Sequence, residues 1–313
     1  METAGELPAS TFAVLARLRN ALRGQALRQD LIAFSFVLPT VIGLLGFYLL
    51  PVIASFALGF MRWSALRPPT WVGLANYAYL MDSRVFWRAL VNTVQYTVVV
   101  VVASTVLGLA AALVLNRPTR AAQVYQSAYF LPYTPSMVAI GIIWLWVLDP
   151  RFGVLNYLIE SLGFPALQWF HSSAWALPTL MLISIWRTVG YNMLFYLAAL
   201  QSLPRELLEA ARVDGATYLQ LLRRIIVPLV SPTTFFVLII GIINSFQVFD
   251  LTYVSTQGGP GYATQTLAYY SYQLGIEFRQ FGLSSAVGYL LFVLIVVFTV
   301  SIFRTESLWV HYR

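Results

Sequence analysis

The sequence predicts an all-α membrane protein with six transmembrane helices and one further helical segment in the cytoplasmic loop between the fourth and fifth. Of its 313 residues, 59% are hydrophobic and 10% are charged, and the mean hydropathy is +0.74. These values are typical of multi-pass membrane proteins and not of soluble domains. Six apolar runs are long enough to supply the roughly 20 residues of helix that a hydrocarbon core requires.

The six runs lie at about 31–60, 90–115, 128–148, 177–200, 229–254 and 283–303. They predict a single transmembrane domain over residues 31–303, preceded by a cytoplasmic segment at 1–30 and followed by a cytoplasmic tail at 304–313. The third run carries Pro132 and Pro135 near its start. Prolines are tolerated in a span where neighbouring helices cover the freed carbonyl groups, and they favour a bend.

Arginine positions predict the orientation, because cytoplasmic loops carry an excess of basic residues. All nineteen basic residues are arginine. With the amino terminus inside, twelve are cytoplasmic (17, 19, 23, 28, 117, 120, 205, 212, 223, 224, 304 and 313), and six are external (62, 67, 84, 88, 151 and 279). Arg187 lies within the fourth span. Both termini are therefore expected in the cytoplasm, and the basic pI near 9.7 needs no nucleic-acid partner.

The composition excludes several classes of catalyst. Without cysteine there is no thiol chemistry, disulfide or iron–sulfur cluster, and without lysine there is no Walker A phosphate loop. The two histidines, His171 and His311, have no second ligand at a useful spacing. No catalytic residues and no metal or cofactor site are therefore expected in this chain.

The segment at 201–228 is the most charged internal stretch. Pro204 suits the first turn of a helix, and Gly215 is a natural helix end because glycine adopts left-handed backbone without a Cβ penalty. Between them lie apolar residues on one side and Arg205, Glu206 and Glu209 around the rest. A second helical run at 217–227 leads to Pro228. The segment is either a solvated loop that joins two spans or an amphipathic helix that docks in a groove on a partner.

The residues of this segment resemble the EAA loop of bacterial ABC importer permeases. The match consists of Glu209, Ala210, Ala211, Asp214, Gly215, Ile225 and Pro228. The resemblance implies that Glu206, Glu209, Ala210, Ala211, Asp214, Gly215 and Pro228 form the element that couples the permease to its ATPase. Glu209 would anchor the helix in the ATPase groove, and Gly215 would set the angle between two short helices.

Four more stretches, at 71–77, 149–156, 200–204 and 258–264, resemble the sugar and glycerol-phosphate uptake branch of that family. The resemblance implies a permease of the bacterial cytoplasmic membrane that works with a second, non-identical permease, two ATP-binding subunits and an external solute-binding protein. ATP and Mg²⁺ would be bound by the partner ATPase.

Polar residues within the spans are candidates for the substrate pathway, because polar groups in a bilayer are costly to keep without a function. The fifth span offers Asn244, Gln247 and Asp250, spaced three apart on one broad helical face, together with Phe246. Such a face could bind sugar hydroxyls and stack on sugar C–H surfaces. The alternative is that these groups form hydrogen bonds between helices.

The fourth span adds Arg187, Tyr191 and Asn192 to these candidates. A buried arginine could pair with an acid, contact a substrate hydroxyl or phosphate, or reach the interface. In the family a basic residue is often followed by Pro-Phe, where this chain has Val189, Gly190 and Tyr191.

The sequence as a whole predicts the permease subunit of an ATP-driven importer that moves a carbohydrate by alternating access. A glycerol-phosphate or polyol importer of the same type is the nearest alternative. An ion-coupled secondary transporter is a rival of a different class; it predicts acidic residues along a coupling pathway and inverted repeats. A membrane-embedded enzyme ranks last, because the spans hold no catalytic constellation.

Overall fold

The computed structural model describes residues 32–64 and 67–311, and the prediction for residues 1–30 lies outside them. The chain divides into two compact units, Met1–Ala57 and Leu58–Arg313. The described part of the first unit is helical, and the helix Ile32–Gly59 crosses the boundary. It includes a π-helical turn, η1 (Leu45–Leu49), and α2 (Leu50–Gly59). Its length and hydropathy of 2.3 qualify it as a membrane span.

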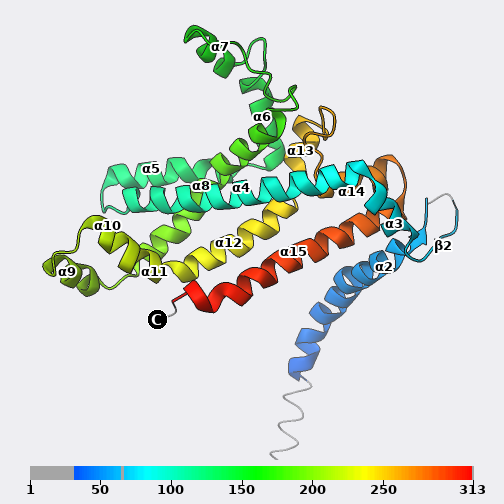
Figure 1. The fold of residues 1–313 in the computed structure, drawn as a ribbon. Coiled ribbons are helices and arrows are strands. Elements are labelled where there is room, and N and C mark those ends of the chain that lie inside the picture. The colour runs from blue at the N-terminus through cyan, green and yellow to red at the C-terminus, as the bar shows by residue number, and fades with distance from the viewer. Residues whose placement is uncertain (1–31, 65–66, 312–313) are drawn as a thin grey trace, which may run out of the picture. The chain divides into compact units, whose positions relative to one another are not determined.

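The second unit begins with a short antiparallel pair, β1 (Met61–Arg62) and β2 (Thr70–Trp71), followed by α3 (Ala75–Asp82). The next helices are α4 (Arg84–Leu115), α5 (Arg120–Phe130), the 3₁₀ turn η2 (Leu131–Tyr133), α6 (Met137–Val147), α7 (Val154–Ser161) and α8 (Ala176–Gln201). Figure 1 shows α8 beside α4, and the two helices pack along each other.

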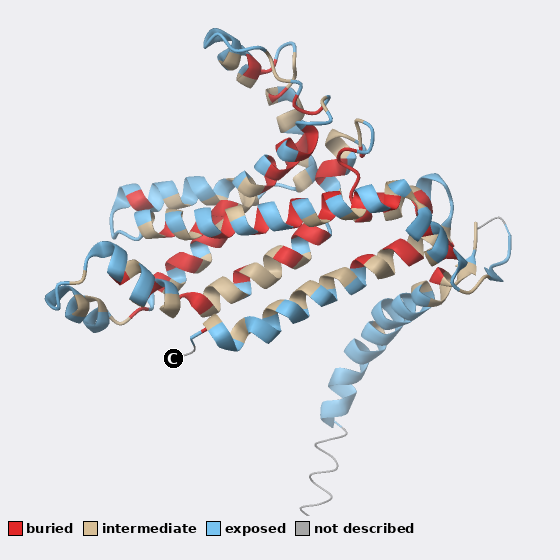
Figure 2. Cartoon of the chain, viewed as in Figure 1, coloured by how far each residue is buried: buried red, intermediate tan, exposed pale blue. Residues whose placement is uncertain are grey.

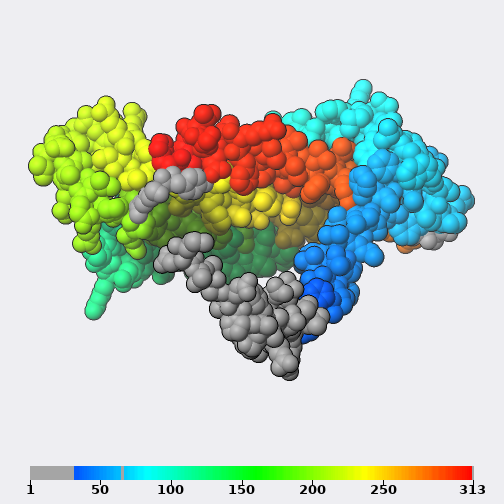
Figure 3. Space-filling view, turned by 90° about the horizontal axis from the view of Figure 1, so that it is seen from below, coloured from blue at the N-terminus to red at the C-terminus, as the bar shows by residue number. Residues whose placement is uncertain are grey.

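The remaining elements complete the unit. They are α9 (Arg205–Val213), α10 (Tyr218–Leu221), the π-helical η3 (Leu222–Ile226), α11 (Val227–Leu229), α12 (Ser231–Phe246), α13 (Asp250–Ser255), α14 (Leu267–Tyr272), η4 (Gln273–Glu277) and α15 (Phe281–Trp309). Figures 1 and 3 place α9 and α10 at one end of this unit and α3 with the start of α4 at the other. The segment predicted as a tail at 304–313 is helical as far as Trp309.

Five helices of the described chain are long and apolar enough to cross a membrane, and a sixth span is possible if one bent pair counts. The bent pair, Arg120–Tyr133 and Met137–Val147, turns by 97°. The run predicted as the third span, 128–148, is therefore bent, at the prolines that favour a bend. Pro135 lies at the turn, where it cannot donate a backbone hydrogen bond, and Ser136 starts α6 by accepting from the Ala139 amide.

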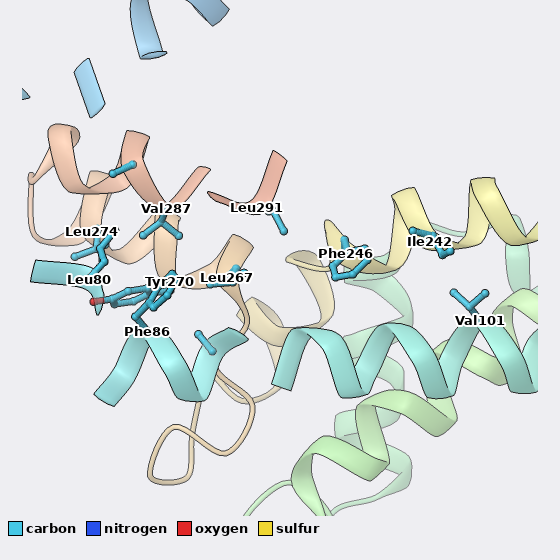
Figure 4. Packing of buried hydrophobic residues seen from close by; sticks show 12 residues of the cluster. Leu80, Phe86, Val101, Ile242, Phe246, Leu267, Tyr270, Leu274, Val287 and Leu291 are labelled. Carbon is cyan, nitrogen blue, oxygen red and sulfur yellow. The ribbon is translucent and has the colours of Figure 1, made fainter. Parts of the chain in front are cut away.

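Three apolar clusters hold the second unit together. One packs α4 against α12, α14 and α15, and Figure 4 shows its side chains meeting between those helices. A second lies among α4, α6, α8 and Leu251 of α13, and a third joins the end of α8 to α10, η3 and Val230. In Figure 2 the buried residues follow the sides on which α4, α8 and α12 face one another. Much of the outer surface is apolar and exposed, as expected for helices in lipid.

Close helix contact fixes the bent pair against α8. A Cβ added at Gly190 would lie 1.8 Å from the Tyr129 carbonyl oxygen, near the end of α5. Only glycine permits this approach, because any larger residue would overlap the backbone of α5. The bend and the middle of α8 are therefore held together at Gly190.

Candidate functional site

A cavity of about 450 Å³ lies among α4, η2, α6, α8 and the α12–α13 junction. Its wall includes six of the seven residues predicted for a substrate pathway: Arg187, Tyr191, Asn192, Asn244, Gln247 and Asp250. Three of these residues come from α8, and the other three come from the end of α12, its C-cap and the start of α13. The fold therefore brings the polar groups of the fourth and fifth predicted spans to one place.

Arg187 is the charged centre of the α8 wall. Its guanidinium carbon lies 4.5 Å from the centre of the Tyr133 ring, and Nη2 donates to the Tyr133 carbonyl oxygen at 3.4 Å. The Tyr133 ring stacks on Tyr191 with centroids 4.4 Å apart, and Tyr191 meets Phe195 at 4.9 Å. Among the described residues, the buried Nε of Arg187 has no hydrogen-bond partner. A donor in this position is available to a ligand oxygen.

Asn192 forms a link between helices as well as part of the wall. It is 4% exposed, and its Nδ2 donates to Ser104 Oγ of α4 at 3.2 Å. A Cβ at Gly108 would lie 2.7 Å from the Asn192 Cβ, so the two helices approach closely here. The side chain of Asn192 therefore ties α8 to α4 at the cavity wall.

Asn244, Gln247 and Asp250 share the cavity wall, but they do not share one helical face. The helix α12 ends at Phe246, Gln247 follows it as the C-cap, and α13 begins at Asp250. All three side chains are exposed to the cavity or solvent. The predicted helical face is thus interrupted by a short break at 247–249, although Ser231–Ser255 as a whole still qualifies as one membrane span.

Phe246 is not part of the cavity wall. Its side chain is fully buried in the cluster of Figure 4 and meets Phe298 of α15 with ring centroids 5.1 Å apart. The aromatic residue that the α12–α13 junction contributes to the cavity is Phe249 instead.

Sequence reasoning missed the contribution of α4. Tyr96 lines the cavity and its hydroxyl is hydrogen-bonded to Ser184 of α8, while Val100 and Ser104 follow it along the wall. The signal that could have found it was the polar set Asn92, Thr93, Tyr96 and Thr97 in a valine-rich run, because this spacing places polar groups on one helical face.

The 201–228 segment is separate from the cavity and folds as two short helices with a defined turn. The Gly215 amide donates to the Arg212 carbonyl at 3.1 Å, and the Ala216 amide donates to that of Ala211 at 3.0 Å. This is the Schellman helix end, and Gly215 has the positive φ, +79°, that it requires. Thr217 and Gln220 then form a capping box at the start of α10. The angle between the helices is therefore set by local hydrogen bonds.

Burial divides the residues of this segment into two sets. Leu208 and Ala211 are half-buried against the third apolar cluster. Outward-facing residues include the predicted coupling residues Glu206, Glu209, Ala210, Asp214 and Gly215 together with Leu207 and Val213. Pro228 is half-buried, and its carbonyl accepts a 2.6 Å hydrogen bond from Ser231 Oγ. The segment thus presents a mixed charged and apolar surface.

Comparisons with known proteins agree with this architecture. The chain is 32% identical over 297 residues to the probable ABC transporter permease YesP of Bacillus subtilis, covering 93% of this chain and 96% of that protein. It is 32% identical to the trehalose/maltose permease MalF of Thermococcus litoralis, covering 87% and 92%. A crystal structure of a bacterial ABC transporter for alginate import contains a chain of similar fold, with a TM-score of 0.80, 25% identity and coverage of 90% and 97%.

A family model described as the binding-protein-dependent transport system inner membrane component matches residues 104–305. This range includes the cavity residues of α8 and α12 and the whole 201–228 segment. Members of this family are the non-enzymatic membrane subunits of ABC importers, and the ATPase is a separate chain. The chain belongs to the family of binding-protein-dependent transport system inner membrane components, the permease subunits of ABC importers.

Proposed function

We propose that this permease moves a carbohydrate through the cavity between α4, α6, α8 and α12. The observation that carries the proposal is the composition of the wall. Tyr191, stacked on Tyr133, adds aromatic surface to the wall, and Arg187, Asn244 and Gln247 offer hydrogen-bonding groups. A few placed polar groups beside aromatic surfaces are typical of small-molecule sites. Sugars present both C–H faces and hydroxyl groups, which this wall matches.

The relatives support a carbohydrate and leave a variant open. Besides MalF, the chain is 35% identical to the sulfoquinovosyl glycerol permease SmoG of Agrobacterium fabrum, over 72% of this chain and 74% of that protein. It is also 31% identical to the sn-glycerol-3-phosphate permease UgpA of Yersinia pestis. The unpartnered Nε of Arg187 favours an anionic polyol such as a glycerol phosphate as the second candidate, because charge-assisted hydrogen bonds are stronger than neutral ones.

We further propose six spans with both termini in the cytoplasm and α9–α10 as the coupling element. Glu209 would lie in the groove of one ATP-binding subunit, with Glu206 and Asp214 beside it. Two ATPase copies, a second non-identical permease and an external solute-binding protein would complete the complex, and ATP with Mg²⁺ would bind to the ATPases. Closure of the ATPases would move α9 and rock the spans, so that the cavity opens to each side in turn.

The first experiment is a tagged pull-down from native membranes in mild detergent, analysed by mass spectrometry. It compares the wild type with Glu209→Arg and with Glu160→Arg, a matched control in which an exposed acid of α7 is reversed. The wild type and the control should bring down an ATPase, a second permease and a solute-binding protein. Glu209→Arg should lose the ATPase and retain the second permease. Absence of an ATPase from all three samples would refute the coupling role.

Uptake by the reconstituted complex then tests the substrate. The panel is trehalose, arabinotriose, sn-glycerol 3-phosphate and sulfoquinovosyl glycerol, each radiolabelled. ATP-dependent uptake of at least one member supports the proposal, and preference for the phosphate compound selects the polyol variant. A complex that hydrolyses ATP with its binding protein and transports none of the four would contradict the carbohydrate assignment. Family membership already excludes the ion-coupled secondary transporter.

A further inference from the structure

Four aromatic rings form a second cluster next to the cavity. Phe249 and Tyr253 lie at the start of α13 and one turn along it, and Tyr269 and Tyr272 lie one turn apart on α14. The ring centroids are 5.0 Å apart for Phe249–Tyr272 and 5.4 Å apart for both Phe249–Tyr253 and Tyr253–Tyr272. These separations are typical of favourable aromatic contacts. We refer to these four residues as the α13–α14 aromatic cluster.

The cluster has a buried base and an open side. Tyr269 is 2% exposed and supports the other rings from beneath, with its centroid 6.2 Å from that of Phe249 and 6.1 Å from that of Tyr272. Tyr253 is 40% exposed, and Tyr272 is half-exposed. Burial, with a further contribution from Glu277, raises the pKa of Tyr269 to about 12.

The cluster is continuous with the cavity through Phe249. This ring lines the cavity and also stacks on Tyr253. Its chain neighbours on the cavity wall, including Gln247 and Asp250, supply exposed hydrogen-bonding groups at the same place. A ligand that leaves the Tyr133–Tyr191 stack towards α13 therefore meets a second aromatic surface with polar groups at its edge.

The backbone that carries the cluster is held in place by buried hydrogen bonds. Thr266 Oγ1 donates to the Val248 carbonyl at 3.0 Å and accepts from the Tyr269 amide, so one side chain ties α14 to the α12–α13 junction. Asn92 Nδ2 of α4 donates to the carbonyls of Tyr262 and Gln265 at 3.0 Å. The rings are thus positioned before any ligand arrives, which lowers the entropy cost of binding.

We infer that the α13–α14 aromatic cluster is a second carbohydrate-binding subsite, on which a sugar ring stacks against Tyr253 before it enters the cavity. The inference rests on the proposed function, because a sugar is the ligand for which alternating aromatic faces and hydroxyl-binding groups form a path. The cluster then receives the sugar from the solute-binding protein and passes it to the Tyr133–Tyr191 stack. The cluster therefore affects the rate at which the sugar is transferred into the cavity, and it does not affect docking of the binding protein.

The test uses the complete transporter in proteoliposomes and the member of the four-compound panel that the wild type takes up fastest. Three variants are compared: Tyr253→Leu, which removes the ring; Tyr253→Phe, which keeps it; and Tyr157→Leu, a control at an exposed tyrosine of α7. Tyr253→Leu should lower the maximal uptake rate about 3- to 10-fold, the order expected for one aromatic contact. Tyr253→Phe and Tyr157→Leu should stay within a factor of about two of the wild type, on the same scale.

Two further measurements distinguish a role of Tyr253 in sugar transfer from a contact between Tyr253 and the binding protein. The concentration of loaded binding protein that gives half-maximal uptake should be the same in all variants, and ATP hydrolysed per sugar transported should rise in Tyr253→Leu alone. A rise in the half-maximal concentration at an unchanged maximal rate would show that Tyr253 contacts the binding protein and would overturn the inference. Equal rates in Tyr253→Leu and the wild type would also overturn it while leaving the proposed function intact. Absence of uptake by the wild type would instead refute the proposed function.

Discussion

At the scale of single residues, Arg187 is the side chain whose setting is hardest to explain by packing alone. It lies in a helix that qualifies as a membrane span, where an arginine is costly. Its contacts with the Tyr133 ring and carbonyl satisfy part of the guanidinium. The Nε group, which has no partner within the described chain, is the part that these contacts leave for a ligand.

Replacing Arg187 by Gln should therefore reduce uptake and leave the assembly intact. Loss of a cation–π contact and a charged donor is worth about 1–2 kcal/mol, or roughly a 5- to 30-fold lower rate at limiting substrate. Arg187→Lys should recover only part of the activity, because a lysine lacks the planar set of donors. The measurement is uptake in proteoliposomes, with pull-down of the ATPase as the check on assembly.

Arg151→Gln serves as the control, since Arg151 is exposed in the loop before α7 and remote from the cavity wall. Its uptake should match that of the wild type. Equal activity of Arg187→Gln and Arg151→Gln would show that Arg187 has only a structural role.

At the scale of elements, the turn between α9 and α10 converts a local hydrogen-bond pattern into a fixed angle. Gly215 has φ +79°, and a Cβ added there would have no neighbouring atom within 4 Å, so substitution meets backbone strain and not a clash. Left-handed backbone costs a non-glycine residue about 1–2 kcal/mol. A substitution at Gly215 would therefore strain the turn and change the angle between α9 and α10.

Gly215→Ala should therefore weaken the association with the ATPase several-fold, by about 1 kcal/mol of strain at the helix end. Gly215→Asn should have a smaller effect, because asparagine tolerates left-handed backbone better than alanine. Titration of detergent-solubilised permease with the purified ATPase measures both affinities. An alanine variant that binds as tightly as the wild type would mean that the angle of the turn does not matter for docking.

Elements that depend on local composition could be predicted from the sequence. Elements that depend on contacts with distant parts of the chain could not. Apolar length predicted the positions of the five long helices that qualify as spans, and the helix end at Gly215 followed from the backbone freedom of glycine. The end of α12 at Phe246 was not predictable, because the break at 247–249 is fixed by contacts such as the Thr266 hydrogen bond to Val248, from a segment 18 residues away. Phe246 was misplaced for the same reason, since its burial depends on α15.

At the scale of the whole molecule, the same contrast applies to the cavity. Its polar residues on α8 and α12 could be predicted as pathway candidates from the sequence, because polar groups are rare in apolar runs. The participation of Tyr96 required the packing of α4 along α8, which a list of apolar runs does not specify. The hydrogen bond between Tyr96 and Ser184 joins positions 88 residues apart. Long-range pairing of this kind depends on the assembled bundle and leaves only a weak trace in the local sequence.

The 97° bend between α5–η2 and α6 divides the third hydrophobic segment into two short helices. The α5 helix has 11 residues, η2 has 3 and α6 has 11. At about 1.5 Å per residue, each half reaches about 17 to 21 Å, which is less than the roughly 30 Å of a hydrocarbon core. Neither half can cross the bilayer as an independent helix.

A chain truncated after residue 148 should therefore fail to insert its third hydrophobic segment stably, and one truncated after residue 201, which includes α8, should insert it. Protease protection of an outward-facing tag, appended after residue 148 in the shorter chain and inserted at 149–153 in the longer one, measures this in membranes that translate the truncated messages. A chain truncated at 115, tagged in the predicted external loop between its two spans, provides the control, because those spans are single long helices. Full protection at 148 would contradict the expectation.

The bend thus makes biogenesis depend on tertiary structure. The nascent chain must remain beside the insertion machinery from residue 120 until α8 has emerged and Gly190 can receive the backbone of α5. During that interval, the freed carbonyl groups near Pro135 face an environment with no partner for them. A substitution that enlarges Gly190 would then lower the amount of permease in the membrane through degradation of half-inserted chains, even where the finished cavity would still transport.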